Sequence, residues 1–297
     1  MRRTLLFKGT GTALVTPFTT NDEIDESALK KLVEYQVKGG VEAILPTGTT
    51  GESVTLTDEE QWRVVSIVVR QAKGRVKVLA GAGSNSTSKA IEHSKHVLDA
   101  GADGILSVAP YYNKPTQEGF YRHYAAIASE IDAPFVIYNV PGRTSSNIEA
   151  ATTLRLAEEF PNIAGIKEAS GNFQQIMEIL KHRPSGFGVW SGDDAIALPL
   201  MALSVDGVVS VVSNEVPKLY SNMIRLCLKG NFIQASQIQY KLLDLMNFNF
   251  VESSPIPVKA VLSAMGMIKE QYRLPLVPLS DKHRPRMNKI LEELGLL

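Results

Sequence analysis

The chain has 297 residues, of which 44% are hydrophobic and 21% are charged, and its 31 basic residues balance its 31 acidic ones. These values are typical of a globular protein, and a net charge of zero offers no electrostatic attraction for nucleic acid or an anionic membrane. No stretch approaches the roughly 20 apolar residues of a membrane-spanning helix, and the apolar run at residues 5–7 is too short for a signal peptide. We therefore expect a cytoplasmic protein that binds neither nucleic acid nor a membrane.

Short apolar segments of β type alternate along the chain with amphipathic helical patterns. We predict eight strands, at residues 11–18, 43–47, 76–82, 104–109, 134–140, 163–169, 187–191 and 207–212. Alternation of nearly continuous apolar strands with helices is typical of a parallel sheet covered by helices, and eight such units close a barrel. An open, doubly wound sheet is the alternative, but residues 81–86 lack the third glycine of its usual fingerprint. The sequence therefore predicts a (β/α)8 TIM barrel.

Helix-capping residues mark the starts of several predicted helices, namely Asp25, Thr57, Ser86, Thr116 and Asn147. After the eighth strand only helical patterns remain, at residues 232–250, 258–265 and 281–294. We therefore expect a barrel over residues 1–228 that contains the active site, and a C-terminal helical domain over residues 229–297. No low-complexity linker separates the two parts, so the helical domain is expected to pack on the barrel.

Lys167 stands in the middle of the predicted strand at residues 163–169, which is an unfavourable place for a charge. Its neighbours on the same face of the strand are Gly165 and Ala169, so we expect open space around the amine. Burial can lower the pKa of a lysine by roughly 3 to 5 units and so supply the neutral amine that Schiff-base formation requires. The alternative is a lysine that extends to solvent or pairs with a carboxylate such as Glu168.

Polar segments follow the predicted strands, at the end of the barrel where active sites of this fold lie. The segment Gly-Thr-Thr-Gly-Glu at residues 48–52 can turn backbone N–H groups toward a small anion such as a carboxylate, and an ordinary capped turn is the alternative. Tyr138 is expected to point into the barrel beside Lys167, where its phenol can transfer protons during imine formation. Arg143 can bind a carboxylate, or it can form a surface salt bridge.

Two adjacent tyrosines, Tyr111 and Tyr112, follow the fourth predicted strand. In an extended chain adjacent side chains point to opposite sides, so at most one of the two can enter the site. We expect the other to pack at a surface or an interface, and packing of both in the core is the alternative.

Asp193 and Asp194 follow the seventh predicted strand, where paired carboxylates can be part of a metal site. No third ligand stands at a suitable spacing, so capping of the next helix is the simpler interpretation. Two carboxylates would also repel phosphate from a position where many barrels bind it, which predicts a substrate without phosphate. His93 and His96 lack further ligands, so we expect no metal site.

Three motifs occur in order at the ends of predicted strands, at residues 48–52 (Gly-Thr-Thr-Gly-Glu), 138–144 (Tyr-Asn-Val-Pro-Gly-Arg-Thr) and 165–169 (Gly-Ile-Lys-Glu-Ala). With these motifs the chain resembles the pyruvate-dependent class I lyases that include N-acetylneuraminate lyase, over essentially its whole length. Within that superfamily it is most similar to the dihydrodipicolinate synthases, whose helical annex is matched by Pro-Ile-Pro-Val-Lys at residues 255–259.

The resemblance implies a reaction in which Lys167 condenses with pyruvate and the resulting enamine attacks the aldehyde of L-aspartate 4-semialdehyde. Cyclisation to 4-hydroxy-tetrahydrodipicolinate follows, in lysine and diaminopimelate biosynthesis. The resemblance also implies that Tyr138 relays protons with Thr49 and with Tyr112 of a neighbouring subunit. Because the lysine itself serves as the electron sink, we expect neither a metal nor an organic cofactor.

The resemblance further implies the residues that bind the substrates. Thr50 would hold the carboxylate of pyruvate and Arg143 that of the semialdehyde, while the backbone of Gly192 and Val209 would line the pocket. A tyrosine donated between subunits requires at least a dimer, and the family implies a homotetramer built as a dimer of dimers.

One part of the family pattern is absent here. Members inhibited by lysine place histidine and glutamate around an interface site, whereas the matching positions in this chain are Asp58, Gln61 and Lys89. The cation at Lys89 would repel the ammonium group of lysine. Other positions of that site do match, namely Ser53, Asn85 and Tyr111. We therefore expect weak or absent feedback inhibition.

Two other functions remain open from the sequence. The first is a lyase for N-acetylneuraminate or another sugar acid, whose site must accommodate a polyol tail where Arg143 offers a second carboxylate partner. The second is a barrel that binds a metabolite without turnover, which would not need a strand lysine beside a phenol.

Overall fold

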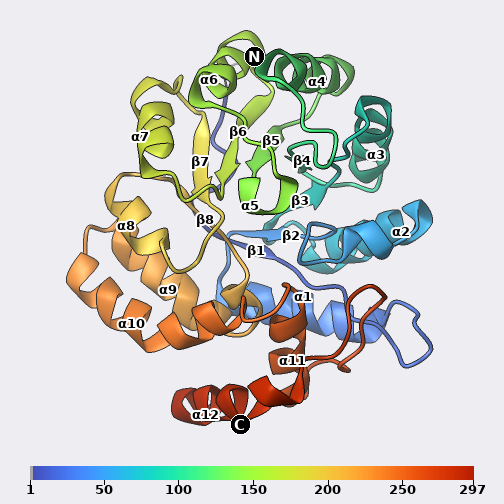
Figure 1. The fold of residues 1–297 in the computed structure, drawn as a ribbon, viewed down its shortest axis with the longest axis vertical. Helices are drawn as coiled ribbons and strands as arrows, with labels where there is room; N and C mark the ends of the chain where they lie inside the picture. The colour runs from blue at the N-terminus through green and yellow to red at the C-terminus, as the bar shows by residue number, and fades with distance from the viewer. Residues whose placement is uncertain (1–2) are drawn as a thin grey trace.

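The computed structural model describes residues 3–297. Eight parallel strands, each hydrogen-bonded to its neighbours in chain order, close into a barrel, and helices surround it (Figure 1). The prediction of a (β/α)8 TIM barrel is therefore confirmed. The strands are β1 (Gly9–Ala13), β2 (Ala43–Leu45), β3 (Lys77–Gly81), β4 (Gly104–Val108), β5 (Phe135–Asn139), β6 (Ile163–Glu168), β7 (Gly188–Ser191) and β8 (Gly207–Ser210).

The helices of the barrel follow the strands in turn. They are α1 (Glu26–Gly39), α2 (Asp58–Ala72), α3 (Thr87–Asp99), α4 (Gln117–Glu130), α5 (Pro141–Thr144), α6 (Ala150–Glu159), α7 (Phe173–His182), α8 (Ala197–Ala202) and α9 (Pro217–Leu228), with short 3-10 helices η1 (Ser53–Thr55) and η2 (Val212–Asn214). Within residues 3–297, no helix combines the length and the apolar character needed to cross a lipid bilayer.

Most of the predicted helix starts carry the expected caps. Asp25, Thr57 and Thr116 each accept a hydrogen bond from a backbone N–H of the first helical turn. Ser86 precedes α3 without such a bond. The start predicted at Asn147 is wrong, because α6 begins at residue 150. The Asn147 side chain instead joins the barrel to α7, since it accepts from Asn139 Nδ2 (2.8 Å) and donates to Gln175 Oε1 (2.9 Å).

The first strand ends at Ala13, well before its predicted end at residue 18. Beyond Ala13 the chain leaves the sheet, and the N–H of Val15 donates to the side chain of Asn214 at 3.2 Å. Leu14, Val15 and Phe18 are buried among apolar residues of α1 and α2. A run of apolar residues predicts burial but does not distinguish a strand from a buried connection, which explains the error.

The rings of Phe7 and Trp190 occupy part of the barrel interior near Lys167. Phe7 stacks on Trp190 of β7, with 4.8 Å between the ring centroids. A Cβ atom on Gly165 would lie 2.6 Å from the Trp190 ring, so the indole occupies the space beside this glycine. The expectation of open space on that side of Lys167 is therefore wrong.

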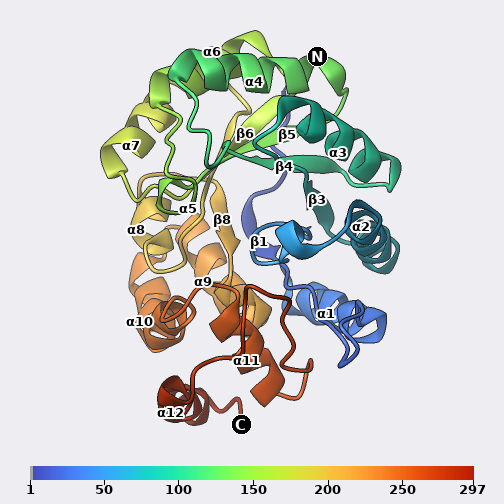
Figure 2. The same cartoon turned by 45° about the vertical axis from the view of Figure 1, so that its right-hand side comes forward.

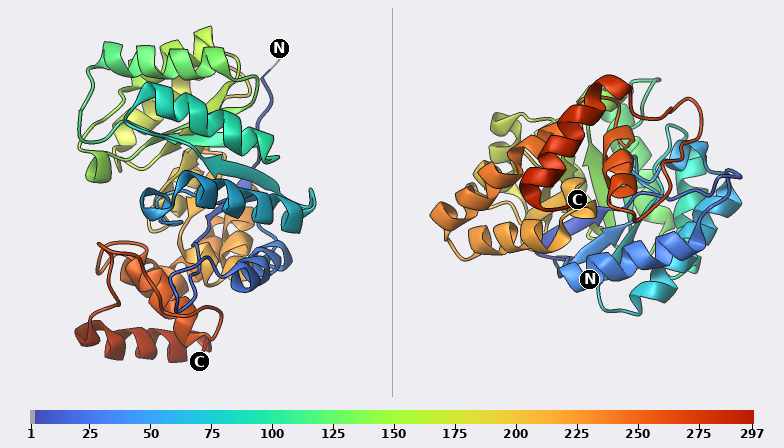
Figure 3. Two further views of the ribbon diagram at one scale, coloured as in Figure 1. Left: turned by 90° about the vertical axis from the view of Figure 1, so that its right-hand side faces the viewer. Right: turned by 90° about the horizontal axis from the view of Figure 1, so that it is seen from below.

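The C-terminal part of the chain is helical, with α10 (Phe232–Phe248), α11 (Ile256–Ala264), η3 (Asp281–His283) and α12 (Arg284–Leu294). These helices gather at the end of the molecule next to α1 and α9, away from α4 and α6 (Figures 2 and 3). Leu242, Leu245 and Ile256 share one hydrophobic cluster with residues of α9. The single helix predicted at residues 281–294 is divided, because a 3-10 turn precedes α12.

Candidate active site

Lys167 lies on β6 with its side chain inside the barrel, and only 5% of the residue is exposed. In the sheet register it stands opposite Tyr138 of β5, and its Nζ atom lies 4.1 Å from the centre of the Tyr138 ring. Burial lowers the pKa of Lys167 to about 7. The negative charge of Asp194 opposes this change, while the positive charge of Arg143 adds to it. A large fraction of the amine is therefore neutral near physiological pH.

The alternative roles considered for Lys167 do not fit the structure. The side chain does not reach solvent to any large extent. Glu168 belongs to the opposite face of β6, where its carboxylate accepts hydrogen bonds from Asn139 Nδ2 (3.1 Å) and Gln175 Nε2 (2.9 Å). It also accepts from the N–H of Ser170 at 2.8 Å. These donors hold Glu168 between the barrel and α7, away from the lysine.

Gly192, at the end of β7, allows the chain to pass close to Lys167. Its N–H donates to the carbonyl oxygen of Glu168 at 2.8 Å. A Cβ atom at this position would lie 2.9 Å from Lys167 Cε and 2.6 Å from the Cβ atom of Ala169, closer than side chains approach. Val209 of β8 is buried in the same cluster of barrel-interior residues as Tyr138. Both predicted pocket residues thus lie in the barrel interior or at its rim.

Tyr138 is 7% exposed, and burial raises the pKa of its phenol to about 12. The positive charge of Arg143 and the hydroxyl group of Thr49 act in the opposite direction. At neutral pH the phenol is therefore protonated, and it can donate a proton or a hydrogen bond to a group bound beside Lys167.

The turn after β2 carries Thr49 and Thr50 and is held by hydrogen bonds on both sides. The N–H of Gly51 donates to Gly48 O at 3.1 Å, and Thr16 Oγ1 donates to Gly51 O at 2.7 Å. The turn leaves Thr49 on the wall of a cavity and buries Thr50 to 5% exposure. An arrangement of this kind can present hydroxyl and N–H groups to a small carboxylate.

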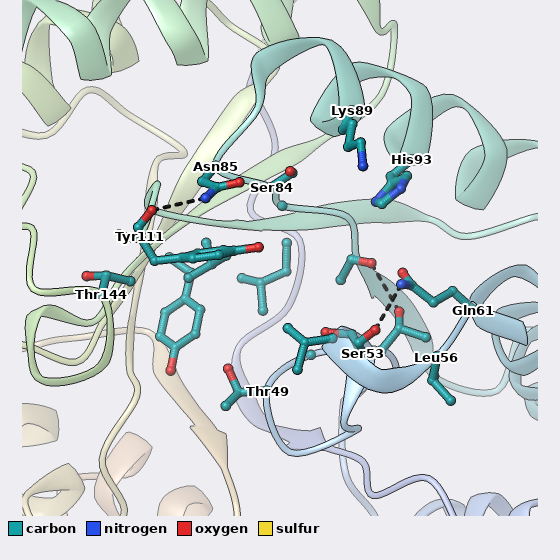
Figure 4. Close-up of a pocket in the computed structure, with 18 of the residues that line it drawn as sticks. Thr49, Ser53, Leu56, Gln61, Ser84, Asn85, Lys89, His93, Tyr111 and Thr144 are labelled. Atoms are coloured by element: carbon teal, nitrogen blue, oxygen red, sulfur yellow. Dashed lines mark hydrogen bonds between the residues drawn. The ribbon is translucent and has the colours of Figure 1, made fainter. Parts of the chain in front are cut away.

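A cavity of about 460 Å³ opens at the carboxyl ends of the strands (Figure 4). One part of its wall comes from Thr49, Tyr138 and Arg143, so the structure brings these predicted residues together. Arg143 lies exposed at the rim and, within residues 3–297, forms no ion pair. Lys167 has its Nζ atom 4.1 Å from the centre of the Tyr138 ring but is not part of the wall. The predicted residues Thr50, Gly192 and Val209 are not part of the wall either.

The other part of the cavity lies between α2 and α3. Lys89 and His93 project from α3 above Gln61 and Ser53 (Figure 4). Gln61 Nε2 donates to Ser53 O at 3.0 Å, and His93 lies 3.1 Å from the carboxylate of Asp58.

This part of the cavity also contains Asn85 and Tyr111, which are joined by a 3.3 Å hydrogen bond from Asn85 Nδ2 to Tyr111 O. All the residues that we compared with the lysine-inhibited members therefore line one cavity.

The two adjacent tyrosines take different positions, but the reason expected for this is wrong. Tyr112 has a left-handed backbone with φ of +71°, so the segment is not extended. Tyr111 lines the cavity, whereas Tyr112 is 89% exposed. Within a single chain Tyr112 does not belong to the cavity wall.

The prediction that Asp193 and Asp194 cap the next helix is also wrong. Helix α8 begins only at residue 197. Asp193 accepts from the N–H of Ala195 at 2.9 Å. Asp194 accepts from the N–H groups of Val211 (2.9 Å) and Val212 (2.8 Å), so it joins the loop after β7 to the end of β8. Its effect on the pKa of Lys167 could not be inferred from the sequence, because the two residues meet only through the folded loop.

Comparison with known proteins agrees with this geometry. A model of the Dihydrodipicolinate synthetase family matches residues 6–294. The 4-hydroxy-tetrahydrodipicolinate synthase of Chlorobium phaeobacteroides is 52% identical over 289 residues, which cover 97% of this chain and 98% of that protein. The chloride-inhibited dihydrodipicolinate synthase of Acinetobacter baumannii, complexed with pyruvate, aligns with a TM-score of 0.95 at 42% identity and covers 98% and 100% of the two chains. The lysine-bound DHDPS of Cyanidioschyzon merolae aligns with a TM-score of 0.96 at 41% identity, covering 99% and 100%.

Proposed function

The chain belongs to the Dihydrodipicolinate synthetase family, and we propose that it acts through an imine formed between Lys167 and pyruvate. The protein condenses pyruvate with L-aspartate 4-semialdehyde to give 4-hydroxy-tetrahydrodipicolinate, a step of lysine and diaminopimelate biosynthesis. The observation that carries the proposal is the buried amine of Lys167, with its pKa lowered to about 7, against the protonated phenol of Tyr138.

The reaction begins when the neutral amine of Lys167 attacks the ketone carbon of pyruvate. The addition product loses one water to form the imine, and Tyr138 supplies a proton to the departing oxygen. Loss of a proton from the methyl group then gives an enamine, because the protonated imine accepts the electron pair. The enamine carbon attacks the aldehyde of the semialdehyde, and ring closure by the substrate amine releases Lys167.

The substrate contacts belong to the same proposal. Thr49 completes the proton relay with Tyr138, and Thr50 binds the carboxylate of pyruvate. Arg143 at the rim binds the carboxylate of the semialdehyde, for which an exposed guanidinium at the cavity mouth is well placed. Gly192 and Val209 border the pyruvate position. The pyruvate complex of the related Acinetobacter enzyme supports this choice of first substrate.

The assembly is part of the proposal as well. The side chains of Tyr112 and Val54 are largely exposed, by 89% and 82%. Both would become buried if a second copy of the chain covered this edge of the cavity, and the partner subunit's Tyr112 would then complete the relay. We assign a cytoplasmic homotetramer, built as a dimer of dimers, with a barrel at residues 1–228 and a helical domain at residues 229–297. Wild-type turnover in a Tyr112→Phe variant would remove this tyrosine from the relay.

Borohydride trapping tests the central step. Treatment with pyruvate and borohydride should add one reduced pyruvate group to the chain, and peptide mass spectrometry should locate it on Lys167. The Lys167→Ala variant is the control and should gain no adduct. An absence of adduct in the wild-type protein would rule out the imine mechanism. A coupled assay that offers aspartate semialdehyde or N-acetylmannosamine as the aldehyde then distinguishes the synthase from a sugar-acid lyase.

A further inference from the structure

Lys259 of the C-terminal helix α11 forms an ion pair with Glu52, the residue that ends the turn after β2. Their side chains are 0% and 1% exposed, respectively. The ammonium group of Lys259 also lies near two aromatic rings, 4.4 Å from the centre of Phe18 and 5.0 Å from that of Tyr272. Lysine is rarely buried to this extent unless a partner compensates its charge, so the contact with Glu52 defines the position of both side chains.

Glu52 is joined directly to the turn that carries Thr49 and Thr50. Its backbone is left-handed, with φ of +54°, which is unfavourable for a residue with a Cβ atom. Its N–H donates to Thr49 O at 3.1 Å, and its carbonyl oxygen accepts from the N–H of Thr55 at 3.1 Å. A movement of the Glu52 side chain would therefore move the backbone beside Thr49.

Arg273 provides a second contact between the C-terminal part of the chain and the same segment. Its Nη1 atom donates to Thr55 O at 2.9 Å and lies 2.6 Å from the carboxylate of Glu60. These contacts lie beyond the turn, at η1 and the start of α2. Of the two cations, Lys259 is the one that reaches the turn itself.

We propose that Lys259, acting through Glu52, is a positioning residue that holds Thr49 and Thr50 in place for bound pyruvate. This inference rests on the proposed function. A misplacement of about 1 Å in an active site can lower the rate on the order of 100-fold. The pair of Lys259 and Glu52 supports the far end of the turn, in addition to the hydrogen bonds at Gly51. The C-terminal helices thus support the pyruvate site, although none of the described residues in the cavity wall comes from them.

The Lys259→Met variant tests the inference, because methionine preserves most of the volume and removes the charge. We expect the KM for pyruvate to rise roughly 10-fold or more, as for the loss of a hydrogen bond to its carboxylate. The rate of borohydride trapping at low pyruvate concentration should fall to match. The KM for aspartate semialdehyde should change little, since Arg143 is not joined to this turn. A merely structural role would lower the melting temperature and leave the pyruvate KM unchanged.

Two further variants make the result decisive. Arg284→Met removes a 3.0 Å ion pair with Glu270 elsewhere in the C-terminal part, and it should lower stability without changing the pyruvate KM. If the Lys259→Met variant does not fold, the double variant with Glu52→Asn and Lys259→Met is measured instead. In this double variant no charge is buried at the pair, and asparagine tolerates the left-handed backbone of position 52. A wild-type pyruvate KM in a folded variant of the pair overturns the inference. Failure of the wild-type protein to form the pyruvate adduct overturns the proposed function instead.

Discussion

Lys167 and Tyr138 face each other on adjacent strands, with the lysine Nζ atom 4.1 Å from the centre of the tyrosine ring. Burial acts on both groups in the direction that suppresses charge, lowering the pKa of the lysine to about 7 and raising that of the phenol to about 12. Between these values the pair consists of a nucleophilic amine and a proton donor. This is the combination that imine formation requires.

The rate of imine formation should therefore depend on pH through Lys167. Below about pH 7 the trapping rate should rise roughly 10-fold for each pH unit, and above that value it should level off, because the amine is then neutral. Rapid-quench trapping with borohydride across this range measures the profile. A rate that kept rising to about pH 10 would show that the lysine retains its ordinary pKa.

The same pKa predicts how Lys167 affects stability. Between about pH 7 and 10.5 the unfolded chain holds a proton on this lysine that the folded chain has lost, so the contribution of the group to the unfolding free energy rises with pH. Below that window the full cost of burying the charge remains. The Lys167→Met variant should thus be more stable than wild type at about pH 6, with a smaller advantage at about pH 10. An equal change in melting temperature at both values would contradict this reasoning.

Removal of the Tyr138 hydroxyl should affect the chemistry more than the fold. Phenylalanine keeps the ring that lies against Lys167, so the melting temperature should stay close to that of wild type. Loss of the proton donor is expected to lower kcat on the order of 100-fold or more. The coupled assay measures this effect, and circular dichroism provides the control for folding. A wild-type kcat would exclude the phenol from proton transfer.

Arg143 should affect the binding of aspartate semialdehyde much more than the reaction of pyruvate with Lys167. Arg143→Gln removes the guanidinium at the cavity rim, and the KM for aspartate semialdehyde should rise roughly 10- to 100-fold, as expected for loss of a charge-assisted hydrogen bond. Trapping of pyruvate should slow much less, because burial is the main cause of the lowered pKa of Lys167 and the Arg143 charge only adds to it. Arg122→Gln is a matched control, because Arg122 is an exposed arginine of α4 that pairs with Glu118. Equal effects of the two substitutions would remove the assigned role.

The Gly192→Ala substitution should displace the side chain of Lys167, because the added methyl group would lie too close to it. The added Cβ atom would lie 2.9 Å from Lys167 Cε and 2.6 Å from the Cβ atom of Ala169, so the strand ends must move apart. Overpacking of this kind costs about 1 to 3 kcal/mol of stability, and the trapping rate should fall as well. Gly142→Ala is the control, since nothing lies within 4 Å of the corresponding Cβ position. An unchanged trapping rate in the Gly192→Ala variant would show that the end of β7 can move to accommodate the added methyl group without displacing Lys167.

Lysine should inhibit this protein weakly or not at all. Lys89 and His93 border the part of the cavity between α2 and α3, and the cation at Lys89 would repel the ammonium group of a bound lysine. Titration of the coupled assay with lysine into the millimolar range checks this expectation. Lys89→Glu should increase the affinity for lysine, whereas complete inhibition of the wild-type protein would show the expectation to be wrong.

The order of the strands, the class of the barrel and the motif positions could be read from the sequence. Periodicity and spacing are local properties, and a barrel fixes which loops meet at its carboxyl ends once the strands are in order. For that reason the expected closeness of Lys167, Tyr138 and the turn at Thr49 is found in the structure. The limits of β1 were harder to predict, because residues 14–18 are equally apolar but leave the sheet.

The contacts that set the chemistry of the site depend on packing between distant segments. Only the tertiary structure showed that the Trp190 ring fills the space beside Gly165, that Asp194 joins the ends of β7 and β8, and that the segment at Tyr112 is not extended. The pair of Glu52 and Lys259 likewise joins residues that are 207 positions apart in the sequence. The sequence by itself determined which residues could do the chemistry, because residue type and strand register are encoded locally. The tertiary structure decided the pKa values of these residues and the contacts that hold them in place, because burial and charge contacts exist only once the chain is packed.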